Sequence, residues 1–137
     1  MTTENDKKTN YHYVLNYEAE RTILIKHEEF NYNLKKQLEE KPLPKWVYFS
    51  SVGEDSMEYH HDIATWIKEN NIKMAFQPGT FQINLGPEKL KDIYENSEVF
   101  FCNVKEAQRI LKIDSNDLPT LLSDIHKLGP KIVCITD

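Results

Sequence analysis

The sequence is poor in several features that whole classes of proteins need. It has only four glycines, none of them in a Walker-type or dinucleotide-binding glycine loop, so those phosphate-binding motifs are excluded. A formal net charge of −5 leaves no cationic surplus for a nucleic-acid backbone. No apolar run approaches the about 20 residues of a membrane span, and the polar start has no signal-peptide core. We therefore expect a cytoplasmic protein that binds neither nucleic acid nor membrane.

Cysteine and histidine are also too sparsely placed to build a metal site. Cys102 and Cys134 have no Cys or His neighbour at ligand spacing, and each lies in an apolar run. We predict that both are small buried core residues rather than a disulfide or metal pair. The five histidines form no metal-binding pattern, and the adjacent His60 and His61 are predicted to lie on a solvated helix face.

The composition that is present supports one domain with a modest core. The chain has 137 residues, of which 39% are hydrophobic. Residues 1–10 are polar and are predicted to form a flexible tail. Residues 11–27 contain two arms rich in β-branched and aromatic side chains around a short turn, which predicts a β-hairpin. Residues 28–40 carry apolar side chains at helical spacing and predict a short helix, broken by the prolines that follow.

From residue 46 onward, compact apolar runs alternate with helical patterns. The runs, which are too short for helices, are residues 46–50, 74–76, 99–102 and 132–135. The helical patterns are residues 55–70, 87–96, 104–112 and 118–128. This alternation predicts βαβ units in an α/β fold with a mostly parallel sheet and flanking helices. Because the strands are continuously apolar, we expect helices on both faces of the sheet.

Ligands in such sheets bind beyond the carboxyl ends of the strands, which selects four loops. These loops are residues 50–54, 77–80, 103–106 and 136–137. Asn103 is a good helix N-cap, and Glu106 three residues later can complete a capping box. The same Glu, held at the ligand edge, could instead orient magnesium-bound waters. Gly53, Pro78 and Gly79 are typical of turns, and they could equally line a substrate cleft.

The order and separation of five segments together resemble the middle of a ribokinase-like (PfkB-type) carbohydrate kinase. The segments are ERTI at 20–23, WVYFSSVG at 46–53, FQPGTFQI at 76–83, VFFCNVKEAQRIL at 99–111, and KIVCITD at 131–137. Each is weak by itself, but together they cover nearly everything after the tail.

The resemblance implies ATP and Mg²⁺ as cofactors and a small sugar or nucleoside as substrate. Asn103 and Glu106 match the family's Asn-x-x-Glu motif near the metal and phosphates, which implies that Glu106 holds Mg²⁺ through water. Thr136 matches the threonine that ends a strand near the nucleotide. Gly53, Pro78 and Gly79 are implied on the substrate side. The hairpin resembles the lid that covers the sugar and often helps the family's members to dimerise.

The sequence also lacks segments that the family has. The glycine-pair strands before the lid have no counterpart, and the Gly-Ala-Gly-Asp region with the catalytic base lies beyond Asp137, so no catalytic residue is assigned. We expect a tail at 1–10, a lid at 11–27 and a partial kinase domain at 28–137. Such a piece of a kinase would transfer the ATP γ-phosphate only with the missing parts, and would be inactive alone.

Cutting a parallel sheet at these points leaves unpaired edges and uncovered apolar faces. We therefore expect self-association, complementation by the missing kinase segments, or low stability. The resemblance of the hairpin to the family's lid implies that a homodimer would form through the hairpin. Two alternatives remain open. One is a non-catalytic α/β interaction or regulatory module derived from a kinase. The other is an unrelated α/β nucleotide-binding domain, which predicts that Glu106 points into a helix cap and away from any cleft.

Overall fold

In the computed structural model, the predicted hairpin and the predicted α/β unit form two different sheets. It describes residues 6–18, 20–26, 28, 30, 32–34, 38, 42–53 and 56–136. The first five residues of the predicted tail lie outside this set, and residues 6–10 contain no strand or helix. Most of the helix predicted over residues 28–40 also lies outside it, although Leu34 and Leu38 are helical and pack into the core.

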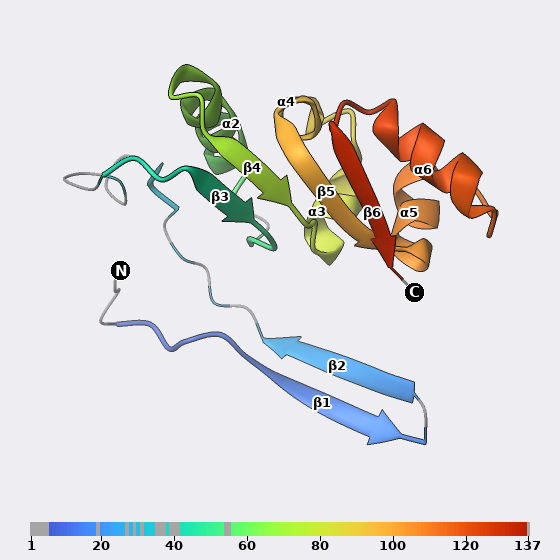
Figure 1. The fold of residues 1–137 in the computed structure, drawn as a ribbon. Helices are drawn as coiled ribbons and strands as arrows, with labels where there is room; N and C mark the ends of the chain where they lie inside the picture. The colour runs from blue at the N-terminus through green and yellow to red at the C-terminus, as the bar shows by residue number, and fades with distance from the viewer. Residues whose placement is uncertain are drawn as a thin grey trace.

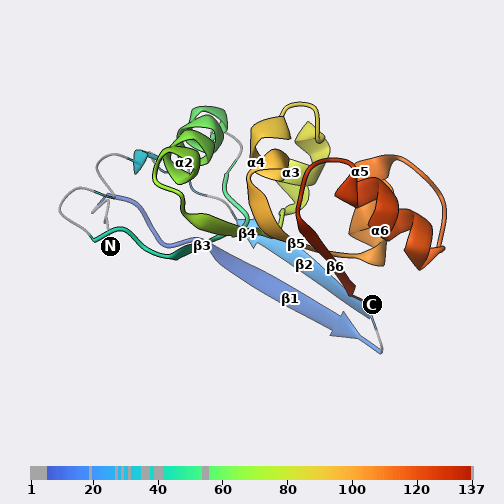
Figure 2. The same cartoon turned by 45° about the horizontal axis from the view of Figure 1, so that its top comes forward.

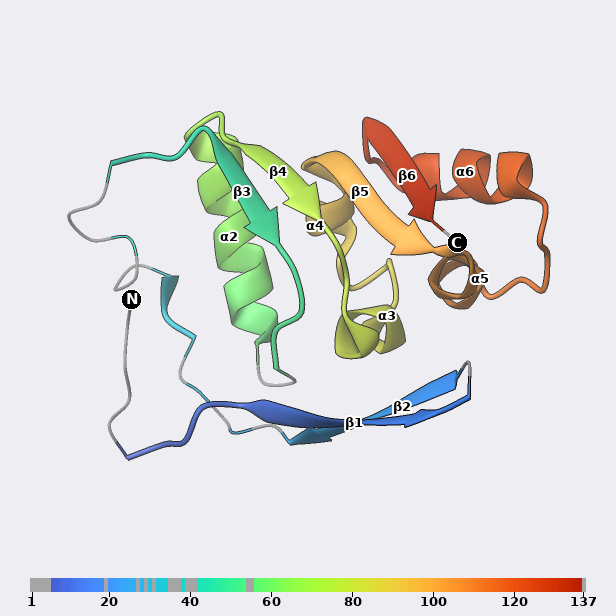
Figure 3. The same cartoon turned by 60° about the horizontal axis from the view of Figure 1, so that its bottom comes forward.

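The hairpin prediction is confirmed. Strands β1 (Tyr11–Tyr17) and β2 (Glu20–Lys26) pair antiparallel, in a register that runs from Tyr11 opposite Lys26 to Tyr17 opposite Glu20. Every β1 side chain is exposed, and so are the β2 side chains that the structure describes, so these residues form no core within the ribbon. It lies on the side of the molecule toward which the strands of the larger sheet point (Figure 1; Figure 3).

The parallel sheet is confirmed as well. Its strands, in spatial order, are β3 (Trp46–Phe49), β4 (Lys73–Phe76), β5 (Ser97–Asn103) and β6 (Ile132–Thr136). Each neighbouring pair is parallel, because a helical crossover returns the chain to the amino edge before the next strand begins. The fold is therefore α/β, with a separate antiparallel hairpin.

The helices follow the predicted alternation with one addition and one shortening. They are α2 (Met57–Glu69), α3 (Thr80–Leu85), α4 (Lys91–Glu95), α5 (Val104–Leu111) and α6 (Leu118–His126). Helix α3 is the addition, and it was not predicted, because six residues are too few to display a helical period. The helix predicted over residues 87–96 is shorter, since residues 87–90 form turns and only α4 is helical.

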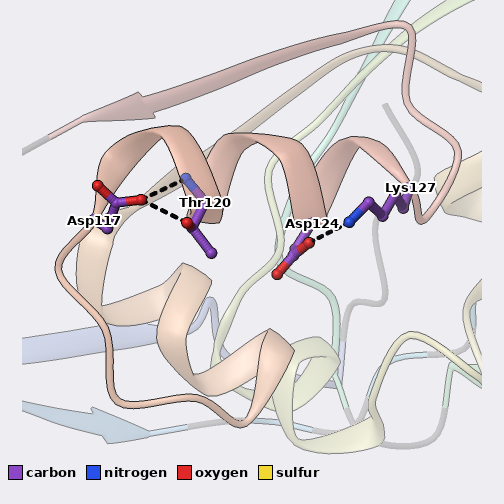
Figure 4. A network of polar contacts seen from close by, with 4 residues as sticks. All are labelled: Asp117, Thr120, Asp124 and Lys127. Atoms are coloured by element: carbon purple, nitrogen blue, oxygen red, sulfur yellow. Dashed lines mark hydrogen bonds and ion pairs between the residues drawn. The ribbon is translucent and has the colours of Figure 1, made fainter.

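Helix α6 illustrates how polar side chains set the ends of these elements. Asp117 is its N-cap, and one carboxylate oxygen accepts hydrogen bonds from both the backbone N–H and the hydroxyl of Thr120 (Figure 4). Near the other end, Lys127 donates to Asp124 at 2.7 Å. Asp117 satisfies an N–H that would otherwise lack an intrahelical partner, so the helix begins at this point of the chain.

The core lies between the sheet and the helices. Its centre is a run of aromatic rings across three strands, in which Phe76 contacts Phe49 at 5.8 Å and Phe100 at 5.7 Å between ring centroids. Tyr94 of α4 stacks on Phe100 at 5.2 Å. Phe76, Phe100 and Tyr94 are all essentially inaccessible to solvent, so the helices are held on the sheet chiefly by apolar burial.

Helices cover only one face of the sheet within the described residues, which corrects the prediction of two covered faces (Figure 2). The register places Val99 and Phe101 of β5 beside Ile132 and Cys134 of β6 on the opposite face. On this open face Tyr48 is 61% exposed, and Trp46 and Ile132 are 48% and 51% exposed. Continuous apolar strands indicated that both faces are apolar, but they could not indicate what covers each face.

No helix among the described residues is both long enough and apolar enough to cross a bilayer.

Candidate functional site

The carboxyl ends of the four parallel strands form one rim, because all four strands point in the same direction. Asn103 and Thr136 are direct neighbours there, at the last paired position of β5 and β6. At the other end of the rim, the Gln77 N–H donates to the Phe49 carbonyl at 2.9 Å, so the sheet register continues into the loop after β4. The rim that the sequence predicted is therefore present.

Asn103 and Glu106 form a reciprocal capping box at the start of α5. The Asn103 side-chain oxygen accepts from the Glu106 N–H at 2.8 Å, and Glu106 Oε2 accepts from the Asn103 N–H at 2.9 Å. Glu106 therefore points into the cap, as the alternative of an unrelated domain expected. The cap nevertheless lies at the rim, beside Thr136, so a capping role and a ligand role occupy the same place.

The donors at this corner suit a magnesium ion that keeps most of its water. Glu106 Oε1 makes no hydrogen bond within the described residues, while Thr136 is exposed. Nowhere in that part of the chain do three or more His, Cys, Asp or Glu side chains gather in a metal-binding group. Mg²⁺ usually takes one or two carboxylates and completes its shell with water and phosphate oxygens, so one carboxylate fits this ion. The assignments of Asn103, Glu106 and Thr136 to the cofactor stay predictions.

The predicted substrate-side residues lie in two loops that touch each other. Gly79, after β4, packs so closely on Ser51, after β3, that a β-carbon at position 79 would lie 2.5 Å from the Ser51 Cβ. A residue larger than glycine therefore cannot be accommodated there without moving the Ser51 loop. The Gly53 N–H donates to the Tyr32 hydroxyl at 3.0 Å. Pro78 is buried, so it can support this wall but presents little surface to a ligand.

Sequence reasoning missed a buried polar pair behind these loops. His60 is 1% exposed, which corrects the prediction of a solvated face for this residue, whereas His61 is exposed and pairs with Asp92 at 3.3 Å. The His60 ring contacts Gln82 of α3 at 3.0 Å. Burial lowers the pKa of His60. The missed signal was its spacing, because position 60 shares a helical stripe with Ile63, Ala64 and Ile67, which are also buried.

The cysteine prediction is right for one residue of the two. Cys102 is buried on the helical face of β5, and burial raises the pKa of its thiol to about 12, so the thiol stays protonated and unreactive. Cys134 is only partly buried and lies on the open face of β6. Both thiols are free.

No protein-family model and no curated protein sequence matches the chain. Solved structures do. A phosphomethylpyrimidine kinase from Clostridium difficile 630 aligns over 90% of this chain and 60% of its own, with a TM-score of 0.61 and 21% identity. A PfkB protein from Polaromonas sp. JS666 aligns over 94% and 48%, with a TM-score of 0.66 and 10% identity. A PfkB family carbohydrate kinase from Listeria grayi aligns over 96% and 46%, with a TM-score of 0.64 and 13% identity.

These similarities concern the fold, since the identities are low. The chain has the ribokinase-like architecture over nearly its whole length, and it spans about half the length of the solved structures that it matches.

Proposed function

We propose that the chain is a piece of an ATP-dependent carbohydrate kinase, which transfers the γ-phosphate of ATP to a hydroxyl of a sugar or nucleoside. The observation that carries the proposal is the adjacency of Asn103 and Thr136 at the carboxyl rim of a parallel sheet. This is the edge at which open α/β sheets bind ligands. The fold similarity to kinases supports the phosphate chemistry at that edge.

The residues at the rim would hold and orient the nucleotide phosphates. Mg·ATP, when bound, supplies the phosphoryl group and neutralises its charge. The first turn of α5 directs backbone N–H groups toward the rim, where they favour negative charge. Glu106 would orient waters of the metal, and its bond to the Asn103 N–H limits how far its carboxylate can turn. Thr136 would offer a hydroxyl to a phosphate oxygen.

A sugar or nucleoside is the proposed acceptor. Two of the similar structures are named as a PfkB protein and a PfkB family carbohydrate kinase. The phosphomethylpyrimidine kinase makes another alcohol a competing acceptor. In the proposal, the loops at Gly53 and Gly79 form one wall of the acceptor site, and the exposed hairpin is its cover.

The remaining catalytic groups would come from outside the chain. We propose that the open sheet face and the β6 edge receive the rest of the kinase fold, and that the hairpin pairs with a second copy. The exposure of Tyr48 and Ile132 supports this, because all-parallel sheets occur almost only in proteins that cover both faces of the sheet. The same open face supports the second candidate function, a non-catalytic interaction module that binds one partner there.

Phosphoryl transfer tests the proposal. The chain is incubated with radiolabelled Mg·ATP and separate panels of sugars, nucleosides and hydroxymethyl heterocycles. One series uses the chain alone, and the other adds polypeptides that supply the strands before the lid and the Gly-Ala-Gly-Asp region of a ribokinase-like kinase. We expect no labelled product from the chain alone, and sugar or nucleoside phosphate from the mixture. The E106Q variant should lower the rate in the mixture at limiting Mg²⁺. Transfer by the chain alone would overturn the incomplete-enzyme proposal, and a complex that forms without transfer would favour the interaction module.

A further inference from the structure

The buried pair of His60 and Gln82 links helix α2, the loop after β3, and the loop after β4 that leads into α3. Gln82 Nε2 donates to the Ser50 carbonyl at 3.1 Å, in the loop after β3. Gln82 Oε1 accepts from the Gly79 N–H at 2.7 Å, in the loop after β4. His60 of α2 supports the same amide from behind, at 3.0 Å. One side-chain amide therefore fastens together both loops of the proposed acceptor wall.

The hydrogen bonds allow only one arrangement of protons. The Ser56 carbonyl lies 2.6 Å from His60 Nδ1, and a carbonyl can only accept, so Nδ1 carries the proton. Nε2 of the neutral ring must then accept from Gln82 Nε2. Turning the Gln82 amide over would bring its NH₂ group against the Gly79 N–H and its oxygen against the Ser50 carbonyl. The neutral imidazole is thus matched to one orientation of the amide.

We propose that neutral His60 is the positioning residue that fixes Gln82 between the two loops, and that one proton added to Nε2 releases the loops from each other. A protonated ring would direct Nε2–H at the Gln82 NH₂ group, so two donors would meet in a site from which water is excluded. His60 is 1% exposed and Gln82 is fully buried, so no solvent is available to separate them. The amide must move, and with it both loop contacts.

The surroundings of His60 favour the neutral ring. Strand β3 presents the apolar ring of Phe49 edge-on at 5.2 Å, and α3 presents the uncharged Gln82. On α2 itself, His61 is the titratable group whose charge acts on His60, in the same direction as burial. The Ser56 carbonyl, which accepts from Nδ1–H, acts in the opposite direction and favours the charged ring, but burial is the larger effect and the pKa of His60 is lowered. At acid pH the ring takes up a proton at Nε2, and the two loops of the proposed acceptor wall are released from each other.

Nuclear magnetic resonance of the intact chain tests this coupling without any nucleotide or acceptor. The four glycines give few, well-separated amide signals, so Gly79 and Gly53 can be followed together with the His60 ring between pH 8 and 5. We expect the Nδ1–H tautomer at pH 8, and a shift of both glycine amides with the midpoint of His60, below the about 6.5 of a free histidine. A Gly79 amide that stays constant while His60 titrates would overturn the proposal.

Two variants distinguish positioning from mere packing. H61Q changes the adjacent, exposed histidine, and it should retain the Gly79 transition, with a midpoint that rises because the charge of His61 no longer acts on His60. Q82E places a carboxylate opposite the ring, and it should raise the His60 midpoint by about 1 to 3 pH units. If Q82E fails to fold, the titrations of the wild type and H61Q still show whether the Gly79 amide shifts together with the His60 ring. The two loops are an acceptor wall only if the kinase proposal holds, whereas this coupling is measured in the free chain, so either can fail without the other.

Discussion

Asn103 shows how one residue can serve a helix and a ligand edge together. Its side chain caps α5, and its backbone N–H is bonded by Glu106, so the corner of the rim has a defined shape before any ligand binds. A carboxylate held in this way loses little freedom when it meets a metal-bound water. The capping interaction is therefore compatible with the proposed cofactor role.

Replacing Asn103 by alanine should destabilise the chain. The N103A variant loses the bond to the Glu106 N–H, and caps of this kind contribute about 1 kcal/mol to the free energy of unfolding. Urea denaturation followed by circular dichroism measures the change. N103D retains an acceptor oxygen and serves as the matched control. Equal midpoints for N103A and the wild type would mean that the capping box contributes nothing to stability.

Asp117 should make α6 sensitive to acid. The hydrogen bonds from Thr120 lower the pKa of this carboxyl in the folded chain. The ionised cap therefore stabilises the fold above the unfolded-state value of about 3.9, and this contribution is lost as pH falls through the lower folded value. Thermal melts should show that the difference between D117A and the wild type shrinks from pH 6 to pH 3. D117N, whose cap does not titrate, is the control, and a constant D117A difference would contradict the assignment.

At the scale of elements, the two faces of β5 carry adjacent residues with opposite surroundings. Phe100 is fully buried between the sheet and α4, whereas Phe101 is partly exposed on the open face. We expect F100A to cost about 3–5 kcal/mol, which is most of the stability of a small domain, and F101A to cost much less. Urea denaturation of both variants measures this contrast. Equal losses would show that the open face is covered in solution.

Most of the helices and strands could be predicted from the sequence alone. The four strands were predictable from their short, continuous apolar runs. Helices α2, α5 and α6 were predictable from apolar residues at helical spacing, and Asp117 marks the start of α6. Helix α3 was not, since its role depends on Gln82 bonding to loops that only the fold brings near. The capping box at Asn103 was predicted from its spacing. The burial of His60 could have been predicted from the helical stripe that it shares with buried apolar residues. The prediction failed because two adjacent histidines are typical of a polar surface.

At the scale of the whole molecule, the uncovered sheet face dominates the expected behaviour. Its exposed aromatic and aliphatic side chains favour association, and so does the edge of β6, with which no other strand of the described residues pairs. The hairpin adds a second exposed apolar surface, with Tyr13 and Tyr17 more than half exposed. A chain that presents both surfaces to water should find a partner or a second copy.

Sedimentation velocity measures that tendency. We expect the wild type to associate between micromolar and hundred-micromolar concentrations, and Y48K on the open face to shift the distribution toward the monomer. L118K is the matched control, because Leu118 is also exposed but lies on α6, away from the open face. A wild-type monomer with a sharp thermal transition that does not depend on concentration would contradict the expectation of an unsatisfied surface.

The central claim is that the carboxyl rim of the parallel sheet binds the nucleotide, and the position at which Mn·ATP binds tests it most directly. Manganese replaces magnesium and broadens the resonances of nearby amides, so a titration of the labelled chain maps the metal. We predict broadening at residues 104–106 and at Thr136, weakened in E106Q, while the amides of Lys73, Ser97 and Ile132 at the opposite edge of the sheet stay sharp. Broadening centred at that opposite edge, or none at the rim at millimolar Mn·ATP, would contradict the assignment of this rim to the nucleotide.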